Sequence, residues 1–213
     1  MLRKIREIIV KHIKNNSNRY FLLFMAFVVG ISAGAFTVNG LSSIQTEELN
    51  VYFQGFLQLL DYQTIDSNEL IKISLMENMK IVGVLWILGV TIIGIPFIYL
   101  AIGIRGFITG FSSGFIIKSL GFKGVLFTLL ALLPKEIFIV PCIIALGVNG
   151  INFSLSIIKN KSIKRLSKEN LKRGFIAYCF TTVLYSLLIF AGILVEVFIT
   201  PVFMRMITPI ITN

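Results

Sequence analysis

Residues 20–40 read YFLLFMAFVVGISAGAFTVNG, a stretch without a single charged side chain. A helix of about 20 such residues crosses the ~30 Å hydrocarbon core of a bilayer. The whole chain has the same character, because 56% of its residues are hydrophobic and only 14% are charged. A soluble domain carries about 25% charged residues. The sequence therefore predicts an integral membrane protein.

The predicted fold class is all-α: a polytopic membrane helix bundle with five transmembrane helices, one of them discontinuous. Beyond the first span, apolar runs cover about 81–103, 125–158 and about 175–200. A glycine-rich third helix lies between the first two of these runs. A transmembrane barrel would instead show segments of ~10 residues that alternate between polar and apolar side chains. The sequence lacks that alternation, so we expect helices.

The fourth apolar run is too long for one crossing. Its 34 residues, 125–158, would form a straight helix of about 50 Å at ~1.5 Å per residue. Pro134 lies within it, and proline removes a backbone donor and clashes with the preceding turn. We therefore predict a half-helix over 124–133, a break at Pro134 and a spanning helix over 135–158.

The placement of charge predicts the orientation. Residues 1–19 contain six Lys or Arg against one Glu, and residues 159–173 contain seven against one. Segment 41–79 contains six acids and a single lysine. Because basic loops stay in the cytoplasm, we expect 1–19 to be a cytoplasmic basic amphipathic segment and 159–173 a cytoplasmic loop. The single membrane domain, 20–213, then exposes 41–79 and its C-terminus outside the cell membrane.

The acidic extracytoplasmic segment carries apolar residues at helical spacing. This pattern predicts an amphipathic helix that lies against the outer membrane surface or a partner. Aromatic residues are favoured at the centres of protein interfaces. The predicted partner-binding residues are Tyr52, Phe53, Phe56 and Leu57.

Glycines recur at four-residue spacing in two of the predicted spans. Gly30 and Gly34 lie in the first span, and Gly106, Gly110 and Gly114 lie in the third. Small residues at this spacing allow two helices to approach closely in a membrane. The sequence leaves open whether these faces pack within one subunit or join two copies into a homo-oligomer.

Three ionisable residues are expected to be buried in the membrane, at Lys135, Glu136 and Glu196. Such residues are costly in lipid and normally have a partner or a role. Lys135 can reach toward Glu196 and pair with it across two helices. One interpretation is a structural pair that locks these helices; the other is an ion or proton site at a broken helix, as in secondary transporters. The second interpretation makes a permease-like transporter or lipid-handling protein the alternative function.

Catalytic and ligand-binding motifs are not apparent in the sequence. There is one histidine, and neither a metal-binding cluster, an activated nucleophile nor a phosphate-binding glycine loop can be recognised. We therefore expect no enzyme activity, no metal and no cofactor. The net charge of +10 resolves largely into the two basic blocks, so the expected partner is the lipid bilayer and not nucleic acid.

Several features occur together along the chain: a basic N-terminus, one span, an acidic external loop and a second basic loop. Between the loops lies the run YLAIGIRGFITGFSSGFIIKSLGFKGVLFTLLALLPKEIFIVPCIIALG at 99–147, and VEVFITP follows at 195–201. With these features the chain resembles the stage II sporulation protein M family over almost its whole length.

This resemblance implies a role in endospore formation. Family members are expected in the septal and engulfing membrane of the mother cell. There they are taken to act as a non-catalytic scaffold for stage II sporulation proteins D and P, two peptidoglycan hydrolases. The complex thins septal peptidoglycan and drives engulfment of the forespore.

Overall fold

The structure is a computed structural model that describes residues 11–62, 67–162 and 168–212. Every regular element in these ranges is helical. Five of the helices are long and apolar enough to cross a membrane. The prediction of an all-α polytopic bundle with five transmembrane helices is confirmed.

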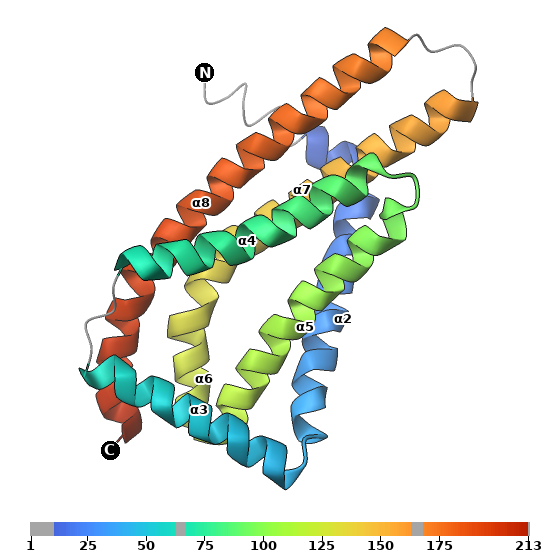
Figure 1. Ribbon diagram of the computed structural model, residues 1–213. Helices are drawn as coiled ribbons and strands as arrows, with labels where there is room; N and C mark the ends of the chain where they lie inside the picture. The colour runs from blue at the N-terminus through green and yellow to red at the C-terminus, as the bar shows by residue number, and fades with distance from the viewer. Residues whose placement is uncertain (1–10, 63–66, 163–167, 213) are drawn as a thin grey trace.

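The long helices pack side by side, and the shorter elements lie at one end of the bundle (Figure 1). The five spans belong to α2 (Ser17–Asn39), α4 (Ser67–Val90), α5 (Gly94–Leu120), α7 (Leu133–Ser162) and α8 (Lys168–Thr212). The remaining elements are α3 (Ser43–Tyr62), α6 (Phe122–Phe127) and the π-helical turn η1 (Thr128–Leu132).

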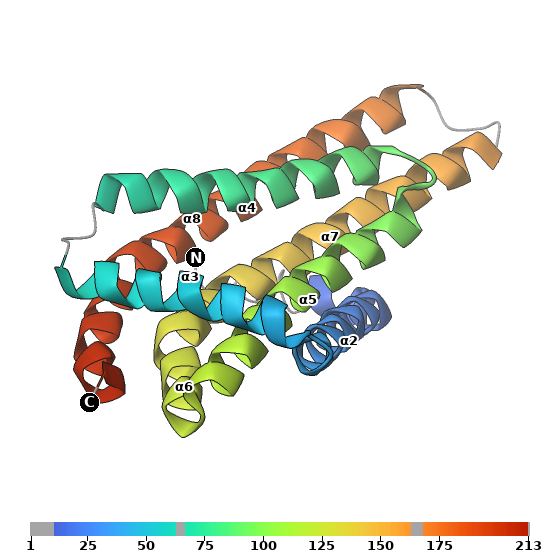
Figure 2. The ribbon, with the colours of Figure 1, turned by 60° about the horizontal axis from the view of Figure 1, so that its bottom comes forward.

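The helix ends are sorted to two ends of the bundle. The α4–α5 turn and the ends of α7 and α8 nearest the basic loop lie at the top of Figure 1, whereas α3, α6 and the C-terminus lie at the bottom. Figure 2 shows α3 running across this lower end, from α2 toward α8. Helix α3 and the described parts of the two basic segments therefore lie at opposite ends, whereas residues 67–79 of the predicted acidic loop belong to the span α4.

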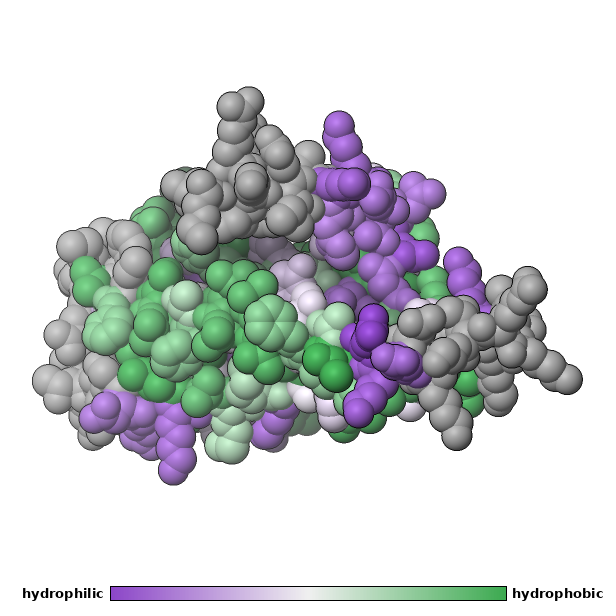
Figure 3. All heavy atoms as spheres, turned by 90° about the horizontal axis from the view of Figure 1, so that it is seen from above, coloured by the Kyte–Doolittle hydropathy of each residue, from purple (hydrophilic) through white to green (hydrophobic). Residues whose placement is uncertain are grey.

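The surface has the apolar character of a lipid-facing bundle. Large exposed apolar side chains occur on every span, among them Phe36, Ile87, Phe97, Ile137 and Leu187. Seen from above, broad apolar areas are interrupted by separate hydrophilic patches (Figure 3). Exposed apolar residues on this scale would be a liability in water, but they are what a hydrocarbon solvent requires.

The predicted second span, 81–103 with Arg105 at its boundary, is wrong in its limits. Helix α4 ends at Val90, the chain turns at 91–93, and α5 starts at Gly94. The hydroxyl of Thr91 donates a hydrogen bond to the carbonyl of Leu88 at 2.8 Å. At Gly94 a side chain would collide with that carbonyl. Hydropathy missed this turn because its residues are nearly as apolar as the helices, and Arg105 consequently lies within α5.

The irregularity in the fourth span begins before Pro134. Helix α6 ends at Phe127, the π turn covers Thr128–Leu132, and Pro134 is the second residue of α7. A proline ring clashes with the carbonyl four residues earlier, which here belongs to Leu130 within the π turn. The wider π turn relieves that clash, and the chain remains helical through it instead of breaking into a separate half-helix.

Helices α2 and α5 are in contact through their backbones. A side chain at Gly30 would collide with the carbonyl of Gly103, and one at Gly34 with that of Phe107. Conversely, a side chain at Gly106 of α5 would collide with the carbonyl of Phe27 on α2. Two further glycines of α5 continue the contact: Gly110 lies against Ile31 and Gly114 against Ala35. Both glycine series therefore meet each other within one subunit.

Helix α7 lies at the centre of the bundle. The main core cluster combines its buried residues, including Ile139, Ile143 and Leu146, with Leu23 of α2, Leu85 of α4, Ile98 of α5 and Ile193 of α8. A fully buried Leu or Ile contributes roughly 1.5–3 kcal/mol relative to exposure to water. In a bilayer this gain largely disappears, so close packing has to hold the spans together.

The α2–α5 contact predicts a large effect for the smallest possible substitution. Gly110→Ala should lower the free energy of unfolding by ~1–3 kcal/mol, because the new methyl group overlaps the backbone of Ile31. Gly83→Ala is the matched control, since nothing lies within 4 Å of the added atom. It should be neutral or stabilise α4 by up to ~1 kcal/mol. Thermal unfolding of the purified protein in detergent measures both, and equal stability of the two variants would contradict this packing.

Candidate functional site

Helix α3 is the most distinctive element at the end of the bundle opposite the basic loop. Its first turn is closed by a capping box: the Ser42 hydroxyl accepts the Gln45 N–H at 3.3 Å, and the Gln45 side chain accepts the Ser42 N–H at 3.1 Å. The helix then continues to Tyr62. The predicted helix in the acidic segment is confirmed, and it begins earlier than its apolar spacing indicated.

One face of α3 fixes the helix to the bundle. The Phe53 ring makes edge-to-face contacts with Phe115 of α5 and Phe127 of α6, with ring centroids 6.1 Å apart in both pairs. The Ser119 hydroxyl of α5 donates a hydrogen bond to the Asn50 side chain at 2.7 Å. Edge-to-face aromatic pairs contribute about 0.5–1.5 kcal/mol beyond their burial. Helix α3 is therefore attached to α5 and α6 at this end of the bundle.

The opposite face of α3 has no intramolecular cover among the described residues. Ile44, Val51 and Tyr52 are 69%, 67% and 80% exposed, and Glu47 and Glu48 beside them are also exposed. Ile44 and Val51 are seven residues apart, so they lie on one stripe of the helix. The result is an exposed apolar stripe with acidic neighbours, on an element that does not cross the membrane.

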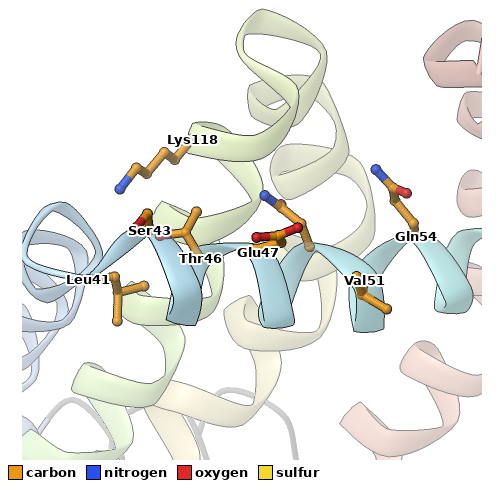
Figure 4. Close-up of a pocket in the computed structure, with 8 residues that line it drawn as sticks. Leu41, Ser43, Thr46, Glu47, Val51, Gln54 and Lys118 are labelled. Atoms are coloured by element: carbon orange, nitrogen blue, oxygen red, sulfur yellow. The ribbon is translucent and has the colours of Figure 1, made fainter.

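A groove of about 580 Å³, lined by polar side chains together with Leu41 and Val51, runs along α3 (Figure 4). Thr46, Glu47, Asn50 and Gln54 line it from α3, and Lys118 comes from the end of α5. The Lys118 ammonium donates a hydrogen bond to the Val38 carbonyl at 2.9 Å, which satisfies an orphan carbonyl at the end of α2. The groove thus exposes carboxylate and amide groups to which another molecule could bind.

The structure does not bring the four predicted partner-binding residues onto one face. Tyr52 points away from the bundle, whereas Phe53 is half-buried in it. Phe56 and Leu57 belong to α3, but their side chains lie outside the described part of the structure. Residues missed by sequence reasoning are Ile44 and Val51, whose seven-residue spacing was the available signal.

A second notable feature is a set of four charges within the spans. The Lys135 ammonium lies 2.6 Å from a carboxylate oxygen of Glu196, and Arg105 lies 3.2 Å from Glu136. The exposed fractions of these side chains are 22% and 11% in the first pair, and 15% and 11% in the second. Successive residues in the first turn of α7 therefore bind α8 and α5.

Within each pair the two charges neutralise each other, but several polar atoms near the pairs have no hydrogen-bond partner. Within the described residues, Arg105 Nε and Glu136 Oε2 are buried without a partner, as are the hydroxyls of Thr128 and Thr200. Such groups cost about 1–3 kcal/mol each when left unsatisfied. Arg105 escaped the sequence analysis because the misplaced span boundary assigned it to the membrane surface.

A metal site is not evident in the described ranges, where no group of three or more His, Cys, Asp or Glu side chains comes together. Cys142 and Cys179 are free and half-buried. The geometry therefore offers a surface for macromolecular contact at α3 and a set of paired charges in the membrane.

Comparison with known proteins agrees with this architecture. The family model described as stage II sporulation protein M matches residues 23–201. The chain belongs to this family. The match covers three of the five spans from end to end, all but the last residue of the fifth and most of the first, together with α3. Family membership and the five apolar helices make this a multi-pass sporulation membrane protein. No match was found among curated proteins or among solved structures.

The ion pairs predict a characteristic pattern in a double-mutant cycle. Glu196→Leu alone should lower the free energy of unfolding by ~3 kcal/mol, because Lys135 is left as an uncompensated charge in the membrane. The double variant Lys135→Met with Glu196→Leu should recover most of that loss. Chemical or thermal unfolding in detergent measures the effect.

The exposed Glu169–Arg173 pair is the control, and Glu169→Gln should lower the free energy of unfolding by less than about 0.5 kcal/mol. Additive losses at Lys135 and Glu196 would show that the pair does not form.

Proposed function

We propose that this protein is a non-catalytic membrane scaffold of the sporulation engulfment complex. In this proposal α3 and the neighbouring helix ends hold two peptidoglycan hydrolases, stage II sporulation proteins D and P, at the outer side of the membrane. The hydrolases thin septal peptidoglycan, and the scaffold fixes where they act. The exposed stripe of Ile44, Val51 and Tyr52, on a helix that lies across one end of the bundle, is the observation that carries the proposal.

Three physical arguments support this role. A helix that lies across the end of a bundle adds little to the membrane core, so its exposed apolar stripe needs another purpose. Its position opposite the basic loop supports a location on the wall side, because basic loops tend to stay in the cytoplasm. Finally, α3 is attached to the bundle by Phe53 and Asn50, which presents the stripe at a fixed height above the membrane and lowers the entropic cost of binding.

The buried charges fit a structural role within such a scaffold. Each carboxylate is neutralised by a cation on a neighbouring helix, and together they fix α7 between α5 and α8. None of these four residues lines the groove along α3, and none lines a largely apolar groove that lies between α2, α7 and α8. In this proposal the helix irregularity at Thr128–Leu132 serves architecture and not transport.

The scaffold proposal predicts that Tyr52→Ser weakens capture of the hydrolases. A central interface tyrosine often contributes ~2 kcal/mol, which corresponds to roughly 30-fold in affinity. Affinity purification of the tagged protein from sporulating cells, with both hydrolases quantified, measures the loss. Gln58→Ser is the control: Gln58 is an exposed polar residue of the same helix, seven residues after Val51, so the change alters the same face without removing apolar contact area and should leave capture unchanged.

Phe53→Ser is unsuitable as the primary test because Phe53 supports α3 from within. It should lower the thermal stability of the protein, whereas Tyr52→Ser should leave stability unchanged. Full recovery of both hydrolases with Tyr52→Ser, at wild-type stability, would contradict α3 as the docking surface.

A further inference from the structure

A second groove, of about 900 Å³, lies at the other end of the bundle between α2, α7 and α8. Its walls are largely apolar, with Phe24 on α2, Pro141 and Ala145 on α7, and Leu188 on α8. Tyr20 of α2 and Tyr185 of α8 line it as well. Apart from these two phenols and the polar residues His12, Ser17, Asn149 and Thr181, the lining is mostly hydrocarbon.

The position of this groove places it in contact with lipid. All three helices that form it contain candidate membrane spans. Its rim residues Phe21, Leu184 and Leu188 are 61%, 50% and 49% exposed, so the groove opens onto the outer surface of the bundle. From Ser17 to Phe24 it follows about 11 Å of α2, in the half of the membrane that contains the basic segments.

The end of the groove near the start of α2 has polar lining residues and lies next to two lysines in the sequence. His12 lines it, and its Nε2 atom is buried without a hydrogen-bond partner among the described residues. The His12 ring packs edge-on against Tyr20, with centroids 6.2 Å apart. Lys11 and Lys14 are exposed on the same short helical segment. An apolar channel therefore leads to a cluster of potential donors for an anion.

The lining favours a flexible chain over a partner helix. Helices pack closely in membranes through small residues, and the small-residue face of α2 is already used by α5. The groove instead has aromatic and long aliphatic residues along both rims. An acyl chain can follow such an irregular wall, and the bilayer supplies acyl chains and phosphate groups together.

We propose that this groove binds an anionic phospholipid, with an acyl chain between α2 and α8 and the phosphate group beside His12, Lys11 and Lys14. The bound lipid would fill the space between these helices on the side of the basic segments. This site is separate from the docking surface on α3, so the two proposals can fail independently.

Native mass spectrometry of the full-length protein in detergent tests the site. The protein is incubated with phosphatidylglycerol or phosphatidylcholine, and the fraction that carries one lipid is measured. We expect wild type to retain phosphatidylglycerol better than phosphatidylcholine. Thr181→Phe, which puts a ring into the groove, should reduce retention of either lipid roughly tenfold, because several methylene contacts are lost.

Thr37→Phe is the matched control. Thr37 and Thr181 are both helical threonines whose hydroxyls donate to the carbonyl four residues earlier at 2.8 Å, but only Thr181 lines the groove. The control should retain lipid like wild type. Equal retention by the two variants, or failure of wild type to retain phosphatidylglycerol, would overturn the proposal.

The headgroup contact is tested separately. Lys11→Gln combined with Lys14→Gln should reduce retention of phosphatidylglycerol to the level of phosphatidylcholine, whereas Lys72→Gln combined with Lys80→Gln on α4 should not. Wild type that binds both lipids equally would overturn anion recognition.

Two further results would identify another occupant of the groove. Lipid retention that rises when residues 1–10 are deleted would show that the chain's own N-terminus fills the groove. A dimer that Thr181→Phe dissociates would identify a second copy as the occupant. Either result would overturn the lipid assignment.

Discussion

The hydrocarbon core of the bilayer offers no hydrogen bonds and no counter-charges, and the architecture follows from that constraint. Backbone groups must be satisfied within each segment, so every crossing is helical. The π turn before Pro134 keeps the chain helical where a straight α-helix would clash. The buried charges are subject to the same constraint, because Lys135 and Arg105 each lie beside a carboxylate from another helix.

Without a strong hydrophobic drive between helices, the bundle relies on geometric fit. Helices α2 and α5 meet backbone to backbone through glycines, and the paired charges fix α7 between α5 and α8. These two contacts also position α3. This helix follows α2 directly and is supported by Phe115 of α5 and Phe127 of α6. The packing of the spans therefore fixes the position of α3 at the end of the bundle.

Properties that depend on one segment at a time could be predicted from the sequence. The apolar composition established the class, the spacing of apolar runs gave five spans, and the apolar periodicity after Leu49 indicated the helix α3. The limits of α4 and α5 could not be found in this way. Hydropathy hardly changes across Thr91–Ile93, and the turn there depends on the hydrogen bond of Thr91 and the close approach at Gly94.

Features that need two or more distant segments were harder still. Helical spacing placed Tyr52 and Phe53 in one group, but only the positions of α5 and α6 show that Phe53 faces inward. The partner of Glu136 is an arginine 31 residues away that the predicted boundary had assigned to the surface. The groove between α2, α7 and α8 combines segments more than 100 residues apart, so no local pattern could reveal it.

The account depends most on which side of the membrane α3 occupies, because a helix on the cytoplasmic side could not reach enzymes that act on the cell wall. Single cysteines at Glu48→Cys and Lys172→Cys, in a chain with Cys142→Ser and Cys179→Ser, measure this directly. A membrane-impermeant maleimide applied to intact cells should label position 48 and spare position 172 until the membrane is permeabilised. Labelling of position 172 but not position 48 in intact cells would contradict the account.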